Sequence, residues 1–175
     1  MSDSPKPEPK DIEIPKEAAE MLIRGEMSLG EFLGLSREKL YGFANQAYQL
    51  LQAGQASKAA EIYEGLVAAA PTDSVFHGQL GATYMTLERF DDAFEAYSKA
   101  LQFNDANVDA LVGRGEIYLR RSMVPEALKD LAAAIQYDPE LKRAATRRAH
   151  GTLLALKVQA EQAKAGTAAP EAPKK

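Results

Sequence analysis

Residues 40–141 consist of three units of 34 residues that align with one another without gaps. The positions that agree between the units hold mostly small or aromatic residues, as in the columns Ala47/Gly81/Gly115, Ala59/Ala93/Ala127 and Tyr63/Tyr97/Leu131. Small residues let two helices approach closely, while the aromatic residues fill the space beside them. A helix pair of this kind leaves an apolar face that only a neighbouring pair can cover, so the repeat predicts an all-α superhelix of stacked helix pairs.

The period and the spacing of small, aromatic and alanine positions resemble the tetratricopeptide repeat. The resemblance implies three repeats of two helices each, at residues 40–73, 74–107 and 108–141. The six helices are then expected near residues 37–53, 57–69, 74–87, 91–103, 107–121 and 125–137. Ala93 is predicted to be buried between the two helices of the second repeat.

Local signals mark where these helices begin and end. Residues of the helix-capping type stand at four of the expected starts: Ser57, Asp73 or Ser74, Asp91 and Asn107. Pro125 suits the first turn of a helix, where the missing N–H costs nothing. Pro71 and Pro139 fall where the second helix of a repeat must end, because proline cannot continue a helix.

Two helical segments are expected to flank the repeats. Residues 15–35 are predicted to form short helices, the second introduced by Ser28-Leu-Gly-Glu31, which has the spacing of a capping box. Residues 139–164 are predicted to form one long helix that caps the C-terminal end of the array. The chain then divides into four parts: a disordered tail (1–14), a helical segment (15–35), the tetratricopeptide-repeat domain (36–165) and a second disordered tail (166–175).

Composition excludes several classes of protein. The 175 residues include no cysteine, which excludes a disulfide scaffold, a thiolate metal site and a cysteine nucleophile. Two histidines are too few for a multi-histidine metal site. The chain has no long apolar stretch, and its start is polar and rich in proline, which predicts neither a membrane span nor a signal peptide. We therefore expect a soluble cytoplasmic protein that is not stably inserted in a membrane.

The charge is distributed unevenly along the chain. Residues 1–140 carry 13 Lys and Arg against 23 Asp and Glu, whereas residues 141–175 carry 8 against 2. An acidic body of this kind repels a phosphate backbone, so nucleic acid is not an expected partner. The basic run from Lys142 to Arg148 could contact an anion, but a solvated helix face that balances the acidic body is the simpler interpretation.

No group of residues has the pattern of a catalytic site. The glycines of Gly113-Arg-Gly115 and the pair Gly78 and Gly81 follow no strand and stand inside predicted helices, which favours contact between helices over phosphate binding. His77 takes a repeat position usually held by a large aromatic residue and is expected to pack. We therefore predict a protein that is not an enzyme and that uses no metal and no cofactor.

The concave surface of the array is the expected binding site. Five positions of the first helix in each tetratricopeptide repeat face that surface. They predict a partner-binding groove lined mainly by apolar residues: Tyr41, Ala44, Tyr48, Leu51, Val75, Gly78, Ala82, Met85, Val112 and Leu119. An exposed concave surface that is apolar usually marks a binding site. The alternative is that the N-terminal helices fold back over this surface and cover it. The positions that clamp the C-terminal carboxylate of heat-shock chaperones in other arrays hold no cation here.

Three stretches carry a more specific resemblance: GEMSLGEFLGLS (25–36), LYGFANQAY (40–48) and LGATY (80–84). They are similar to the class II chaperones of bacterial type III secretion, which are built from three tetratricopeptide repeats. The resemblance implies a cytoplasmic chaperone whose groove holds an extended apolar segment of a hydrophobic translocator protein and keeps that client soluble and competent for export. It also implies pairing of two copies through residues 15–35.

Two other functions stay open at this point. One is a general tetratricopeptide scaffold or adaptor in a multiprotein assembly. The other is an adaptor that acts through the basic C-terminal helix. The sequence does not identify the client or the oligomeric state.

Overall fold

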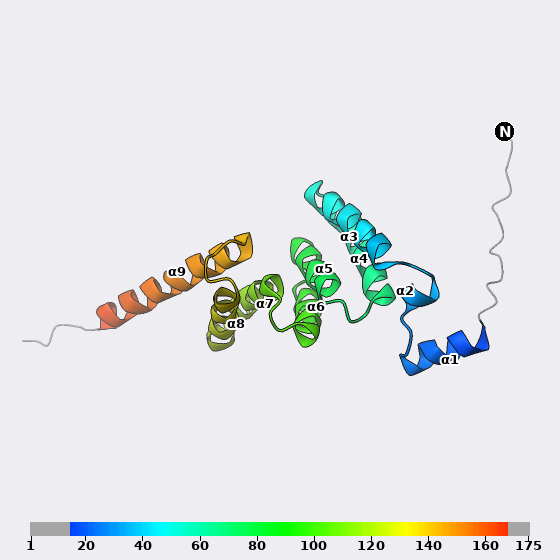
Figure 1. The fold of residues 1–175 in the computed structure, drawn as a ribbon. Coiled ribbons are helices and arrows are strands. Elements are labelled where there is room, and N and C mark those ends of the chain that lie inside the picture. The colour runs from blue at the N-terminus through cyan, green and yellow to red at the C-terminus, as the bar shows by residue number, and fades with distance from the viewer. Residues whose placement is uncertain (1–14, 168–175) are drawn as a thin grey trace, which may run out of the picture.

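The structure, a computed structural model, describes residues 15–167, with side chains up to residue 164. Within this part of the chain every regular element is an α-helix (Figure 1), which confirms the all-α prediction. The helices are α1 (Lys16–Arg24), α2 (Leu29–Phe32), α3 (Arg37–Gln52), α4 (Ala56–Ala69), α5 (Ser74–Thr86), α6 (Phe90–Phe103), α7 (Val108–Arg120), α8 (Val124–Tyr137) and α9 (Ala144–Thr167). The predicted tail 1–14, and residues 168–175 of the second tail, lie outside the described residues.

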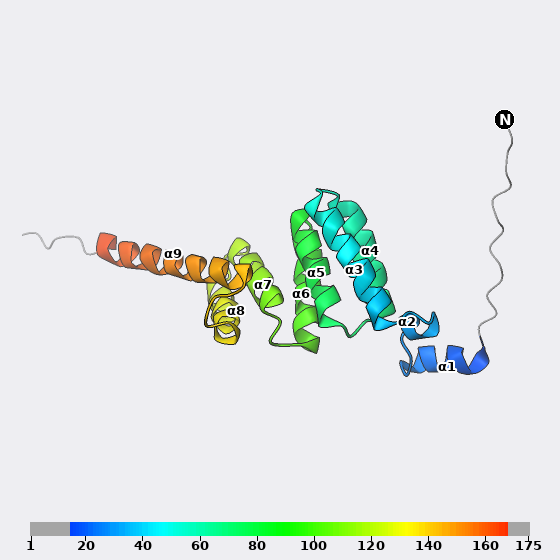
Figure 2. The ribbon, with the colours of Figure 1, turned by 45° about the horizontal axis from the view of Figure 1, so that its top comes forward.

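Three helix pairs make up the body of the molecule. The pairs α3–α4, α5–α6 and α7–α8 follow one another in a row, with α1 and α2 at one end and α9 at the other (Figures 1 and 2). Each of the six helices begins and ends within one residue of its predicted bounds. The register read from the 34-residue repeat is therefore confirmed.

The contact between the second and third pairs is built around Tyr97 of α6, which is buried. A Cβ atom on Gly81 of α5 would stand only 2.7 Å from a ring carbon of Tyr97, and one on Gly113 of α7 would overlap the ring. Both glycines are thus required by helix packing, as predicted. Ala93, on the same helix as Tyr97, is completely buried, which confirms its predicted place.

His77 of α5 packs as expected. Its ring stacks on Phe103 with 5.5 Å between the ring centroids, and Nε2 lies in hydrogen-bonding distance of the Pro71 carbonyl oxygen, at 2.8 Å. The residue is buried. This histidine therefore joins the two helices of one repeat and does not face a site.

Two of the four predicted helix caps are present. The Asp73 carboxylate accepts hydrogen bonds from the N–H groups of Val75 and Phe76 at the start of α5. The side chain of Asn107 accepts one from the N–H of Ala110 at the start of α7. Each bond satisfies a backbone donor that the helix itself leaves without a partner.

The predicted caps at Ser57 and Asp91 are wrong, because α4 and α6 each begin one residue earlier and have no side-chain cap. In both cases a tight turn places the helix start. Gly54 and Glu88 adopt left-handed backbone conformations, with φ of 75° and 58°. The N–H of the next residue then donates to the carbonyl five residues before it, at 2.9 Å in each turn. This closure ends one helix and leads directly into the next.

The third repeat is held by a buried ion pair between its two helices. Arg114 of α7 donates from two of its nitrogens to the two carboxylate oxygens of Asp130 in α8, at 2.7 and 2.9 Å. The Asp130 side chain is only 6% exposed. The hydrogen bond to Asp130 raises the pKa of Arg114 further above its ordinary value. A paired geometry of this kind is what allows a carboxylate to be buried at all.

The long C-terminal helix begins at Ala144 and not at Pro139. The cause is Asp138, whose carboxylate accepts hydrogen bonds from the backbone N–H of Arg143 at 2.9 Å and from the buried hydroxyl of Thr146 at 2.5 Å. These bonds organise residues 139–143 as a loop. They also hold the pKa of Asp138 below its ordinary value, with the Thr146 hydroxyl the larger contribution.

The first half of α9 takes the place of the first helix of a fourth repeat. Ala149 lies 34 residues after Gly115 and is buried with Ala145 against the third repeat. The second half of α9 extends away from the array (Figures 1 and 2), and Leu154 and Val158 are half exposed. The helix therefore covers the end of the array with its first half only, and it continues beyond the predicted end at residue 164.

Candidate partner-binding groove

In the first repeat the predicted groove residues are uncharged and accessible. Tyr48 of α3 is 48% exposed, and Ala44 and Leu51 on the same helix are partly exposed. The Ala44 carbonyl accepts a hydrogen bond from the hydroxyl of Tyr63 in α4 at 3.1 Å, which fixes the two helices of this repeat together. Burial raises the pKa of Tyr63 to about 12, so that hydroxyl stays protonated near neutral pH.

Tyr41, the first predicted groove residue, is engaged by neighbouring side chains. Its hydroxyl donates to the Asp73 carboxylate at 3.0 Å, and its ring contacts Phe76 of α5 with 5.0 Å between centroids. The guanidinium of Arg37 lies 5.4 Å from the centre of the same ring. Because both the hydroxyl and the ring are engaged, Tyr41 joins the first two repeats and offers a partner only part of its surface.

In the second repeat the predicted groove is only partly open. Val75 of α5 is 43% exposed, and Ala82 and Met85 are partly exposed. Gly78 is buried, because the side-chain amide of Asn107 lies over it and donates to the carbonyl and the hydroxyl of Ser74, at 3.1 and 2.8 Å. A Cβ on Gly78 would stand 3.2 Å from that amide nitrogen. The sequence pattern had placed Gly78 on the open surface, and that placement is wrong.

In the third repeat the predicted groove is closed by α9. Val112 is completely buried in a cluster that includes Ala145 and Ala149 of α9, so its assignment to the partner-binding surface is wrong. The acidic residues beside it are also engaged, as Asp109 pairs with Arg143 and Glu116 with Arg148, each at 3.2 Å.

Leu119, near the end of α7, stays partly exposed. It is the one predicted apolar groove residue of this repeat that a partner can reach. The exposed basic residues Arg143 and Arg148 balance the acidic body, as expected, although Arg143 lies in the loop before α9. Arg147 donates to two backbone carbonyls of that loop.

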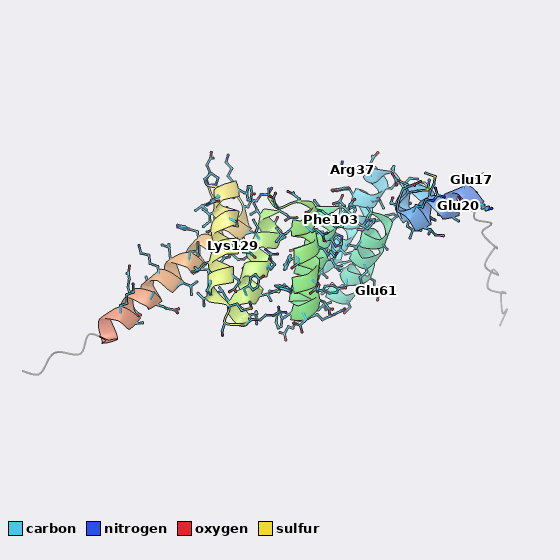
Figure 3. All side chains as sticks on the ribbon, turned by 90° about the horizontal axis from the view of Figure 1, so that it is seen from below. Glu17, Glu20, Arg37, Glu61, Phe103 and Lys129 are labelled. Carbon is cyan, nitrogen blue, oxygen red and sulfur yellow. The ribbon has the colours of Figure 1, made fainter. Side chains whose placement is uncertain are left out.

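The N-terminal helices do not cover the groove. Gly30 of α2 packs against α4, where a Cβ would stand 2.7 Å from the Ala69 carbonyl oxygen, while α1 extends outward from the end of the array. Ile23 of α1 is 85% exposed. Figure 3 shows Glu17 and Glu20 on this helix, at the end of the molecule opposite α9. The alternative in which these helices fold over the concave surface is therefore not what the structure adopts.

The N-terminal segment instead borders a hollow that the sequence pattern did not indicate. The hollow has a volume of about 790 Å³ and lies between the α1–α2 turn, the start of α3 and the loop from α4 to α5. Its apolar lining comes from Leu22, Met27, Leu29, Leu35, Leu40, Tyr41, Ala70, Pro71 and Phe76. Only Tyr41 is shared with the predicted groove. The capping box at Ser28 and Glu31, which is present as predicted, was the one local signal that α2 would be held in place here.

Within residues 15–164, no three His, Asp or Glu side chains gather in a way that could hold a metal ion. Burial raises the pKa of Tyr84 to about 12, and its hydroxyl donates to Glu64 at 2.7 Å, so it acts in packing. No helix within residues 15–167 combines the length and the apolar character needed to cross a lipid bilayer.

No protein-family model matches the chain. Two curated relatives from the mouse are similar in part: tetratricopeptide repeat protein 14, 33% identical over 66 residues, and sperm-associated antigen 1, 30% identical over 105 residues. These matches cover 38% and 60% of the chain, but only 9% and 11% of the relatives. The chain therefore spans about a tenth of the length of the curated relatives it matches.

Solved structures are similar over a larger share of the chain. One is a type III secretion complex from Aeromonas hydrophila, with a TM-score of 0.71, 18% identity and coverage of 83% of this chain and 99% of that one. The chain has the tetratricopeptide-repeat fold.

Structures of the Yersinia enterocolitica translocator chaperone SycD are also similar. The complex of SycD with a peptide of the translocator YopD has a TM-score of 0.63 at 23% identity, over 71% of this chain and 97% of that one. An alternative dimer of SycD has a TM-score of 0.66 at 21% identity, over 73% and 98%. At these identities the likeness concerns the fold.

Proposed function

We propose that this protein is a cytoplasmic chaperone that binds an extended apolar segment of a hydrophobic, translocator-type client on the concave face of its first two repeats. One observation carries the proposal: the uncharged side chains of Tyr48 and Val75 are exposed on α3 and α5, and those of Leu51, Ala82 and Met85 are partly exposed on the same helices. A further support is SycD, a chaperone of the same fold that has been solved with a translocator peptide.

The mechanism rests on the behaviour of membrane-inserting clients in water. Such a client exposes apolar surface before it reaches its membrane and aggregates through that surface. An apolar groove that holds a short extended segment removes part of this surface from water. The acidic body of the chaperone keeps the complex dispersed by charge repulsion. No nucleotide is needed for this mode of action.

The test is co-expression with a translocator-type protein encoded beside this protein's gene, measuring how much of that client stays soluble. We expect the double variant Tyr48→Glu and Met85→Glu to abolish client capture, because a carboxylate pressed against an apolar side chain loses water and gains no partner. The control is Leu128→Glu, which changes a leucine of similar exposure on α8. Full solubilisation by the double variant would contradict the proposal and favour the general scaffold or adaptor, the second candidate.

Pairing of two copies through residues 15–35 is a separate part of the proposal. Its support is that α1 buries none of its residues within the protomer although Met21 and Ile23 are apolar and exposed. SycD, a protein of the same fold, is described as a dimer. We expect Ile23→Glu to lower the mass measured by analytical ultracentrifugation to that of a monomer. A wild-type protein that is already monomeric would contradict this part alone.

A further inference from the structure

The hollow beside the N-terminal helices is a second apolar site, and we call it the N-terminal hollow. Its volume of about 790 Å³ lies in the range of ligand pockets and is far larger than a packing defect. Leu40 and Phe76 of its lining belong to the core, whereas Met27 and Leu35 are partly exposed. Leu29 of α2 is 41% exposed. Apolar side chains are therefore accessible around an unfilled space.

Two walls of the N-terminal hollow are held in place. The N–H of Ser28 donates to the Glu31 carboxylate at 2.8 Å, and Gly30 packs closely on α4, which fixes α2. The hydroxyl of Tyr41 donates to the Asp73 carboxylate at 3.0 Å, which joins the start of α3 to the start of α5. These walls are formed before any ligand arrives.

The third wall, α1, has too little packing of its own. Ala18, Ala19 and Leu22 are partly exposed on one side of this helix, and Leu22 lines the hollow. None of the residues of α1 is buried. A helix of this length is marginal in water unless its apolar side is packed. A ligand in the hollow supplies such a contact to Leu22.

The charges of the lining favour a cation. The lining contains Glu26, Glu31 and Asp73 but only one basic residue, Arg37. Arg37 lies beside the ring of Tyr41, and its charge interacts with that of Asp73. Glu26 and Glu31 pair with no lysine or arginine within residues 15–164. The bonds from Ser28 hold the pKa of Glu31 below its ordinary value, so this carboxylate is ionised near neutral pH.

We propose that the N-terminal hollow binds a segment of a partner protein in which bulky apolar side chains stand beside lysine or arginine. The apolar side chains lie among Met27, Leu29 and Leu35, and the cations lie beside Glu26 and Glu31. This site goes beyond the proposed function. It shares only Tyr41 with the predicted groove, so a partner bound here leaves the concave face of the first two repeats free.

The test uses fluorescein-labelled peptides and the full-length protein, with affinity measured by fluorescence polarisation. The probe, GRLFRG, places two apolar residues between arginines. GELFEG keeps the apolar pair and reverses the charges, and GRSSRG keeps the charges without the apolar pair. We expect the probe to bind about tenfold more tightly than either comparison peptide, because only the probe satisfies both the lining and the rim. Equal affinities, or no binding, would overturn the proposal.

Variants then locate the probe. Leu29→Gln should weaken it about tenfold, and Glu26→Gln about threefold, since an exposed charge contributes less than a buried apolar contact. The matched controls are Leu33→Gln and Glu17→Gln, which change exposed residues outside the lining and should leave the affinity unchanged. An equal loss with a variant and its control would overturn the proposal.

Other occupants of the hollow give different results. If a second copy fills it, Leu29→Gln lowers the mass measured by analytical ultracentrifugation without peptide. If Ile12 and Ile14 of the same chain fill it, replacing both with Gln raises the affinity for the probe about tenfold. Either result would overturn the proposal.

A last pair of measurements separates this site from the groove. The double variant Tyr48→Glu and Met85→Glu should bind the probe as wild type does, and Leu29→Gln should keep the client soluble as wild type does. Loss of the probe with the double variant would place it in the groove and overturn the proposal. Failure of the client test alone would contradict the proposed function and leave the N-terminal hollow supported.

Discussion

The first and third repeats differ at one position of the predicted groove. Ala44 on α3 is partly exposed, whereas Val112, at the same place on α7, is buried. The difference comes from the next helix on the concave side. The third repeat is followed by α9, whose alanines pack on α7 and whose Arg148 pairs with Glu116, while Arg143 of the preceding loop pairs with Asp109. A repeat position thus becomes core or binding surface according to its neighbour.

The second and third repeats also differ in the contacts that hold their two helices together. The prediction with the largest expected effect concerns the third repeat. Arg114→Met should lower the free energy of unfolding by about 3–5 kcal/mol, because it leaves the buried Asp130 carboxylate without its partner. Urea denaturation measures the loss. Adding Asp130→Leu to this variant should restore most of the stability. A single variant as stable as wild type would show that the pair does not support this repeat.

The second repeat depends on close apolar contact instead. Ala93→Leu should overpack the buried site between α5 and α6 and lower the free energy of unfolding by about 1–3 kcal/mol. The matched control is Ala132→Leu, which adds the same atoms to an exposed position of α8. If both variants unfold at the wild-type urea concentration, close packing at the alanine column does not hold this repeat together.

The connection between the third repeat and α9 should depend on pH. The Thr146 hydroxyl and the Arg143 N–H hold the pKa of Asp138 below its ordinary value. The ionised carboxylate therefore stabilises the folded protein above the unfolded pKa of about 3.9, and this contribution is lost as the pH falls below it. We expect Asp138→Asn to lower the urea midpoint at pH 7 and the difference from wild type to shrink in acid. Asp105→Asn, an exposed control, should change neither; a difference that persists in acid would contradict the role of the charge.

The smallest effect concerns the turns that close the first helices of repeats one and two. Gly54 has a left-handed backbone without strain, whereas Glu88 adopts the same conformation with a side chain. Gly54→Ala should cost about 1 kcal/mol, and Glu88→Gly should gain about 0.5 kcal/mol, since relief of strain exceeds the added freedom of the unfolded chain. Differential scanning calorimetry would detect opposite shifts of Tm. Shifts of the same sign would show that the two turns are not equivalent.

The helices and their pairing could be predicted from the sequence alone. The columns of glycine and alanine recur with the 34-residue period in each repeat, so a helix that is poorly marked in one repeat is located from the other two. The caps at Asp73 and Asn107 are local signals that mark two of the helix starts. They placed both ends of six helices within one residue and predicted the burial of Ala93 and the packing of His77. The resemblance in the flanks and the first two repeats indicated the chaperone hypothesis, and solved structures confirm the fold that this resemblance implies.

Which concave positions stay open depends on tertiary contacts that the sequence pattern could not predict. Gly78 is closed by Asn107, Val112 by α9, and the Tyr41 hydroxyl is taken by Asp73. In each case the covering group lies about thirty residues further along the chain. The repeat pattern predicts on which helix such a residue lies, but it does not predict which neighbouring residue its side chain contacts. The start of α9 was misplaced for a related reason. The Asp138 carboxylate accepts hydrogen bonds from Arg143 and Thr146. Hydrogen bonds of this kind are not repeated along the chain, so the 34-residue pattern does not predict them.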